Sequence, residues 1–150
     1  MALELNTIGI TLGYCAEVTA GTKPTSGYTT IANITSIGEI SADPDTLEVT
    51  NLSDTFKRYI AGVKDTGGNI EVGANFTAAF KTAWAAAVTA YSTAFAASKA
   101  LWWQVHVPSF GDFYFAGEPI DLGLPGIEVN QVFAGTVNII PNQVAGWATT

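Results

Sequence analysis

The stretch DTLEVTNLSDTFKRYIAGVKDTGG, residues 45–68, holds three of the six basic residues of the chain, an alternating strand pattern and a glycine pair. Leu47 and Val49 alternate with polar residues, which predicts a β-strand. The triplet DTG at 65–67 also occurs in the catalytic loop of aspartic proteases, but that chemistry needs two carboxylates sharing a proton in a dry site. Here a lysine precedes the triplet and a second glycine follows it, which indicates a solvated turn. We therefore interpret the stretch as a docking loop.

The composition indicates one domain with little charge. Of 150 residues, 48% are hydrophobic and 13% charged, against about 25% charged in typical domains. So little charge suggests that part of the surface lies against copies of the chain or against a partner. The net charge of −7 argues against tight binding of nucleic acid, because phosphate binding needs clustered Lys and Arg. We expect a single domain over residues 1–150.

Few residues in the sequence could carry chemistry. Cys15 is the single cysteine, which excludes a disulfide framework and suits a reducing cytoplasm. His106 is the single histidine, and in a predicted strand it is expected to face solvent or to hydrogen-bond within the sheet. The first ten residues lack the pattern of a signal peptide, and no apolar run reaches the ~20 residues of a membrane span. We expect no catalytic residues, no cofactor, no metal and no membrane association.

One segment has the period of an α-helix. Thr77 is a good N-cap, and alanines fill the positions between larger side chains. These larger side chains recur at steps of three or four residues: Phe80, Trp84, Val88, Tyr91 and Phe95. The spacing predicts a helix over about 77–94 that packs an aromatic stripe on a sheet.

The rest of the sequence predicts strands and turns. Segments rich in β-branched and aromatic residues are 7–14, 28–34, 46–50, 69–76, 100–107, 112–117 and 131–140. Two of them form a hairpin that turns at 109–112, with Pro108 ending the first strand. About seven or eight strands and one flanking helix predict a mainly β fold, either a β-sandwich or a partly closed barrel.

Residues 34–76 resemble the middle of the major tail tube proteins of long-tailed, non-contractile (siphovirus-type) bacteriophages. In that family a strand ending in Glu-Val-Thr or Asp-Val-Thr runs into a loop of the pattern T-x-L-x-D-x-x-K-x-Y-I-x-G-x-x-D-x-G. The matching residues here are Thr50, Leu52, Asp54, Lys57, Tyr59, Ile60, Gly62, Asp65 and Gly67. The flanking ITSIGEI and NIEVGANF and the closing segment VHVPSFGDFYFAG look like the family too. The resemblance extends from residue 9 to 142, although the helix is longer and the loop TAGTKPTSGY departs from the pattern.

The resemblance implies a tail-tube fold and a structural subunit. Such subunits assemble as hexameric rings that stack into a hollow tube for DNA ejection. The implied partners are copies of the chain and the tape measure, tail tip and tail terminator proteins, with DNA only in transit. The implied location is the virion, and the host cytoplasm during assembly. The negative net charge is consistent with a lumen that repels phosphate and lets DNA pass.

We expect ten residues in and before the docking loop to make contacts between subunits. A basic and aromatic cluster lies where the resemblance places inter-ring contacts, and an acidic group precedes it. Weak charge pairs repeated on every subunit of a ring could steer stacking. The residues are Phe56, Lys57, Arg58, Tyr59 and Lys64, with Glu39, Asp43, Asp45, Glu48 and Asp54. The alternatives are that the aromatic pair caps the core and that the charges form solvated pairs within one subunit.

Two other functions remain alternatives. One is a carbohydrate- or receptor-binding β-sandwich module, in which Trp102, Trp103, Phe113 and Tyr114 would form an aromatic platform. Their strand alternation favours packing in and around the core instead. The other is a related tail component or a secretion-tube protein, which would share the fold and differ in its partners.

Overall fold

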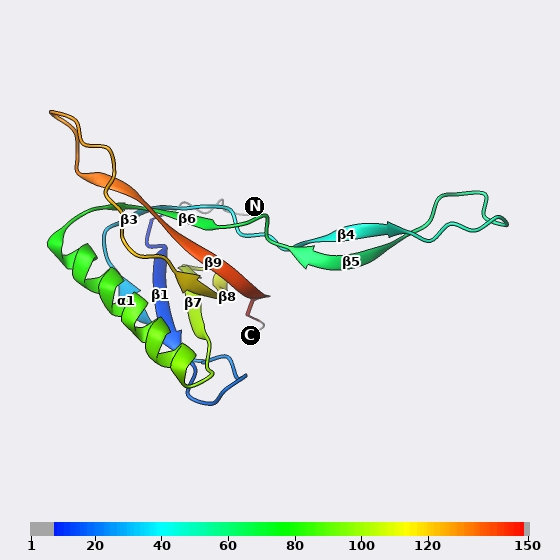
Figure 1. Cartoon of the computed structure of the whole chain (residues 1–150), viewed down its shortest axis with the longest axis horizontal. Helices are drawn as coiled ribbons and strands as arrows, with labels where there is room; N and C mark the ends of the chain where they lie inside the picture. Colours follow the sequence, from blue (N-terminus) through cyan, green and yellow to red (C-terminus); the bar gives the residue numbers. More distant parts are fainter. Residues whose placement is uncertain (1–7, 149–150) are drawn as a thin grey trace.

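A computed structural model describes residues 8–148 as a curled antiparallel sheet, a helix beside it and a long projecting hairpin (Figure 1). Seven strands form the sheet in the order β2-β1-β7-β8-β9-β6-β3, and β4 and β5 pair separately. The strands are β1 (Thr11–Ala16), β2 (Thr29–Ile31), β3 (Ile34–Ile37), β4 (Asp43–Glu48), β5 (Tyr59–Asp65), β6 (Ile70–Asn75), β7 (Leu101–Val107), β8 (Gly111–Pro119) and β9 (Ala134–Trp147), and the helix is α1 (Ala78–Ala96).

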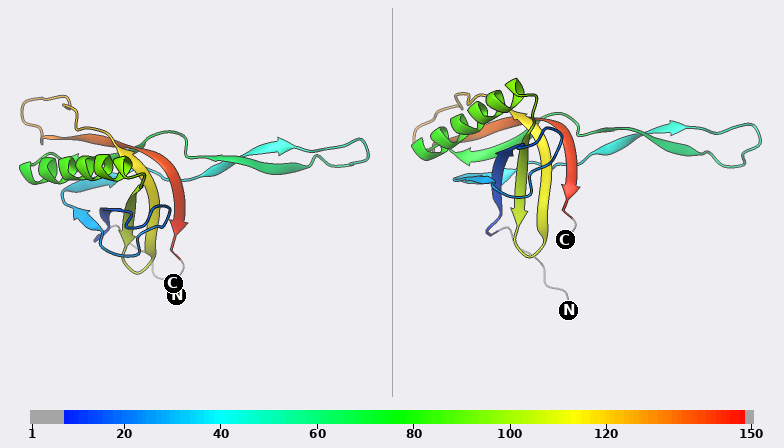
Figure 2. Two further views of the ribbon diagram at one scale, coloured as in Figure 1. Left: turned by 60° about the horizontal axis from the view of Figure 1, so that its bottom comes forward. Right: turned by 90° about the horizontal axis from the view of Figure 1, so that it is seen from below.

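The sheet bends along β9, its longest strand (Figure 2). The first half of β9 pairs with β6 and the second half with β8, and Ile139 has a partner on both sides. Two register shifts between β8 and β9 increase the local bend, as β-bulges do. The two edge strands, β2 and β3, are joined by only Ala32 and Asn33. The sheet is therefore a partly closed barrel.

Aromatic side chains fill the space between α1 and the sheet. Phe80 and Trp84 of α1 are buried, and the Trp84 ring lies 5.7 Å from that of Trp103 on β7. Phe115 lies opposite Trp103 on the neighbouring strand β8, and their ring centroids are 6.4 Å apart. Both indole N–H groups are satisfied by backbone carbonyls, Trp84 donating to Ile120 at 2.8 Å and Trp103 to Gly117 at 3.1 Å. This arrangement buries the large rings without leaving their polar atoms unpaired.

The helix runs from Ala78 to Ala96, where the sequence predicts 77–94. Thr77 is its N-cap: the residue is extended, and its hydroxyl accepts a hydrogen bond from the Phe80 N–H at 3.1 Å. The aromatic stripe is buried only in its first half, and Phe95 is 69% exposed. The other buried side chains of the helix are the small ones of Ala87 and Ala94.

Each of the seven segments expected as strands overlaps an observed strand, and the mainly β class with one helix is confirmed. Residues 1–7, which include the first residue of the segment 7–14 and most of the N-terminal segment that lacks a signal-peptide pattern, lie outside the described residues. Of the two architectures expected, the structure has the partly closed barrel. The β4–β5 pair projects into solvent (Figure 1) instead of stacking on the larger sheet as in a sandwich. β3 and β5 were not expected as strands.

The loop 17–28 covers the outer face of the sheet. The Tyr28 ring lies 5.6 Å from that of Tyr114, and the Lys23 ammonium lies 3.6 Å from the Tyr114 ring centroid. Trp102 is buried in the same cluster. Burial raises the pKa of Tyr28, and the nearby ionisable Tyr114 and Cys15 raise it further. The loop that departs from the tail-tube pattern thus closes a small second core.

Candidate functional site

The described residues offer little that could do chemistry. No group of three or more His, Cys, Asp or Glu side chains in 8–148 is placed to hold a metal ion. His106 pairs with Asp112 across β7 and β8 in a half-exposed hydrogen bond, as expected for a surface histidine in a sheet. A hollow of about 570 Å³ at the open end of the sheet is lined by apolar, Ser, Thr and Gly residues, including Ile10, Val107 and Trp147. Within residues 8–148, no helix is long and apolar enough to cross a membrane.

The most unusual feature is the hairpin of β4 and β5, which we call the projecting hairpin (residues 43–65). It extends away from the curled sheet along the long axis of the molecule (Figures 1 and 2). Every residue of the two strands is exposed except Gly62, which is half-buried. A two-stranded hairpin without a third element against it is only marginally stable in water. The hairpin therefore has the form of an element that needs a partner surface.

Both faces of the projecting hairpin carry apolar side chains. Leu47 and Ile60 are opposite each other on one face, and Tyr59 lies opposite Glu48 on the other. Each of the three apolar side chains is about half exposed. A solvated hairpin would normally keep one face polar, so this pattern fits burial of both faces by neighbours. Burial of each such side chain would contribute about 1.5–3 kcal/mol.

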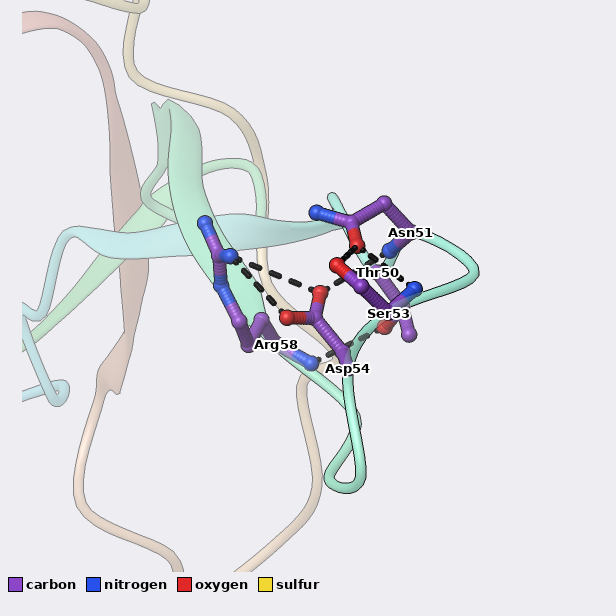
Figure 3. Close-up of polar contacts among 5 residues, drawn as sticks. All are labelled: Thr50, Asn51, Ser53, Asp54 and Arg58. Atoms are coloured by element: carbon purple, nitrogen blue, oxygen red, sulfur yellow. Dashed lines mark hydrogen bonds and ion pairs between the residues drawn. The ribbon is translucent and has the colours of Figure 1, made fainter.

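The end of the hairpin, residues 49–58, is ordered by polar contacts (Figure 3). Asp54 accepts a hydrogen bond from the Asn51 N–H at 2.9 Å and forms an ion pair with Arg58 at 3.3 Å. The Thr50 hydroxyl accepts from the Arg58 N–H at 2.9 Å, and the Asn51 side chain accepts from the Ser53 N–H at 3.0 Å. These contacts connect the polar groups of five residues at the end of the hairpin: Thr50, Asn51, Ser53, Asp54 and Arg58. Leu52 and Phe56 are fully or mostly exposed at its end.

The structure brings nine of the ten expected contact residues onto the projecting hairpin. They lie on β4, in the loop 49–58 or on β5, and Glu39 lies just before β4. Only Asp54 and Arg58 form an ion pair among the described residues of the hairpin. Asp43 lies opposite Asp65, a like-charge pair that is unfavourable across strands. The side chains of Phe56 and Tyr59 are exposed and do not cap the core.

The sequence interpretation missed a second exposed apolar segment, the β8–β9 loop (residues 120–133). Leu124, Ile127, Val129 and Val132 are all mostly exposed there. The sequence GLPGIEVNQVF, residues 123–133, does indicate an exposed apolar loop, because its apolar residues alternate with turn residues and follow no strand or helix period. The proposed aromatic platform is not present, because Trp102, Trp103 and Tyr114 are each at most 5% exposed.

No protein-family model and no curated protein matches the chain. Among solved structures, a chain from the tail of an empty gene transfer agent particle with C6 symmetry has a TM-score of 0.60 at 15% identity, covering 98% of this chain and 99% of that one. A chain from the virion of a native gene transfer agent particle has a TM-score of 0.55 at 18% identity, covering 81% and 89%. A chain from the baseplate of the anti-feeding prophage has a TM-score of 0.59 at 9% identity, covering 97% of both. The chain thus shares its fold with components of tail and baseplate particles.

Proposed function

We propose that this chain is a structural, non-catalytic subunit of a phage tail tube, in which copies form hexameric rings that stack into a hollow conduit for DNA ejection. Its fold matches a chain of a C6-symmetric tail over nearly its whole length. The sequence pattern of residues 50–67 supports the long-tailed, non-contractile type in particular. The place of action would be the virion, after assembly in the host cytoplasm.

The observation that carries this proposal is the projecting hairpin with two apolar faces. Leu47, Ile60 and Tyr59 are exposed on strands that have no other element against them in the described structure. A monomeric protein rarely exposes large apolar patches without a partner. In a tube, the hairpin would be covered by neighbouring copies, and the ten charged and aromatic residues named above would lie at or near that contact.

The remaining partners of a tail tube follow from the same proposal. The tape measure protein would occupy the lumen, and the tail tip and tail terminator proteins would bind the two ends of the tube. The net charge of −7 disfavours retention of DNA in the lumen.

A second candidate is a related tail component that ends or joins a tube instead of forming its length. The likeness to a chain of the anti-feeding prophage baseplate favours it. Such a protein would form one ring and stop, whereas a tube subunit would continue to stack. The two candidates share the fold and differ in whether copies polymerise.

Electron microscopy of the concentrated, purified protein tests the proposal. A tube subunit is expected to form hollow filaments, a ring component only rings. The Phe56→Ala/Tyr59→Ala double variant should raise the concentration needed for filaments by about a hundredfold, since each of the two lost anchors is worth about 1.4 kcal/mol, or tenfold, at a buried contact. Val18→Ala, at an exposed site of the loop after β1, is the matched control. Filaments of the folded double variant at the wild-type concentration would remove the hairpin from assembly, and a wild-type protein that stays monomeric would contradict the function.

A further inference from the structure

The β8–β9 loop is a second surface that needs a partner. Its base is fixed: the Ile120 N–H donates to the Asn138 carbonyl at 3.0 Å, and the Phe133 ring meets Phe76 edge-on at 5.5 Å. Pro125 lies so close to Gly135 that a Cβ at residue 135 would be 2.8 Å from the Pro125 side chain. The loop is thus held in place, while the apolar side chains between residues 124 and 132 remain exposed.

The β8–β9 loop and the projecting hairpin lie at opposite ends of the molecule. In Figure 1 the longest axis is horizontal, and the hairpin extends to one end while the loop between β8 and β9 extends to the other; both views of Figure 2 agree. The end of the hairpin therefore cannot cover the loop of its own chain. Two unlike surfaces at opposite ends can cover each other only between copies, in a head-to-tail contact that continues without closing on a pair.

Charge makes the two surfaces complementary. The β8–β9 loop contains Asp121 and Glu128 and no basic residue, a formal charge of −2. The hairpin end, residues 49–58, contains Lys57, Arg58 and Asp54, a formal charge of 2 − 1 = +1. The two surfaces therefore attract, whereas two copies of either surface would repel. Both also present exposed apolar side chains beside the charges, Leu52 and Phe56 on the hairpin and Ile127 and Val129 on the loop.

We propose that the β8–β9 loop of one copy receives the end of the projecting hairpin of another copy. This inference rests on the proposed function, because it supplies the receiving surface for a subunit that polymerises. Leu52 and Phe56 pack on the apolar part of the loop, and Lys57 faces Asp121 or Glu128. The acidic residues on β4 are then not the surface that the basic end meets.

Cysteine cross-linking tests the contact directly, in a Cys15→Ser background that removes the native thiol. A Leu52→Cys chain and an Ile127→Cys chain are mixed under assembly conditions, oxidised briefly and separated on a non-reducing gel. Mixed dimers are expected at about ten times the yield given by Leu52→Cys with Val18→Cys, because only the first pair would be held together. A chain carrying both Leu52→Cys and Ile127→Cys should give a ladder of covalent oligomers. Phe56→Cys with Val129→Cys is the second pair, used if either first variant fails to fold.

A charge swap tests whether Lys57 meets the β8–β9 loop of another copy or the acidic residues of its β4. Lys57→Glu should raise the concentration needed for assembly by roughly tenfold, and Glu128→Lys should do the same. The two changes together should recover most of the loss. If Asp45→Lys restores assembly of the Lys57→Glu variant and Glu128→Lys does not, the inference is wrong. The basic end of the hairpin would then meet the acidic residues of β4 in another copy.

The cross-links and the filaments answer separate questions. Wild-type filaments with Leu52–Ile127 cross-links no more frequent than the Val18 control would overturn the inference and leave the tube subunit standing. A ladder of cross-linked oligomers from a protein that forms no hollow filaments would support the contact and contradict the tube. Far-UV circular dichroism of each variant shows that an effect on assembly is not an effect on folding.

Discussion

At the scale of single residues, Gly117 shows how closely β8 and β9 approach where the sheet bends. It lies at a register shift between the two strands. A Cβ there would be 2.8 Å from the Ile140 carbonyl oxygen and 2.8 Å from the Ile139 side chain. Its own carbonyl also accepts the Trp103 indole N–H. The bend of the sheet therefore depends on a residue without a side chain.

Gly117→Ala is expected to lower the free energy of unfolding by about 1–3 kcal/mol, because backbone must move to admit the methyl group. Urea unfolding measures the loss as a shift of the midpoint at unchanged slope. Gly123→Ala is the control, since nothing lies within 4 Å of a Cβ at that position. Equal urea midpoints for the two variants would show that the sheet tolerates a methyl group at residue 117.

The raised pKa of Tyr28 predicts that the protein loses stability at alkaline pH. Burial raises its pKa, and its hydroxyl donates to the Pro24 carbonyl at 2.9 Å. A group whose pKa is higher in the folded than in the unfolded chain contributes stability that is complete below the unfolded value, about 10 for tyrosine, and is lost as the pH rises through the folded value. Tyr28→Phe should therefore show a flatter decline in unfolding free energy above pH ~10 than the wild type. Urea titrations at several pH values, with Tyr59→Phe as the exposed control, measure it; parallel curves would contradict the assignment.

At the scale of secondary-structure elements, Thr77 joins the start of α1 to the sheet. Its hydroxyl accepts from the Phe80 N–H and from the Asn33 side-chain amide at 2.9 Å. Asn33 lies between the two edge strands and has a positive φ of 65°. One hydroxyl thus caps the helix and fixes the connection between the edges of the sheet.

Thr77→Ala is expected to cost about 1 kcal/mol of stability, typical for the loss of an N-cap. Thr77→Ser keeps the hydroxyl and should cost much less. Thermal unfolding, followed by circular dichroism at a wavelength that reports helix, measures the difference in stability between the two variants. A serine variant as unstable as the alanine variant would assign the effect to the methyl group instead of the cap.

The elements differ in how far the sequence could predict them, for physical reasons. α1 was predictable because its cap and its aromatic spacing are local signals. β5 was missed because Tyr59 and Ile60 place apolar groups on both of its faces and Gly62 lies in its interior, so the one-sided alternation of a surface strand is absent. β3 has only four residues, too few for a pattern. The sequence pointed to the basic and aromatic end of the hairpin, but its separation from the β8–β9 loop depends on the tertiary fold.

At the scale of the whole molecule, the projecting hairpin and the curled sheet should be separable. The large buried side chains all lie in the sheet and in α1. Replacing residues 47–60 by a two-residue Asn-Gly turn would close the hairpin at the pairing of Thr46 with Ala61.

This shortened chain is expected to keep its unfolding free energy within about 1 kcal/mol of the wild type, because no core contact is removed. It should also lose filament formation, because the docking surface is gone. Near-UV circular dichroism and urea unfolding measure the first outcome, and electron microscopy measures the second. Loss of the near-UV signal would show that the hairpin stabilises the sheet within one subunit.

The order of strands along the chain also determines when each pair of strands can form during synthesis. β1 pairs with β7, and Leu12 lies opposite Val105, so 105 − 12 = 93 residues separate the partners. β2 can pair with one edge of β1 early. At ribosomal rates of about 5–20 residues per second, however, the other edge of β1 waits roughly 5–20 s for β7. β7 and β8, joined by a short turn, can pair as soon as they emerge. Each newborn chain would thus acquire its curled sheet only near the end of translation, and pulse-labelled hydrogen exchange should find β7 and β8 protected before β1.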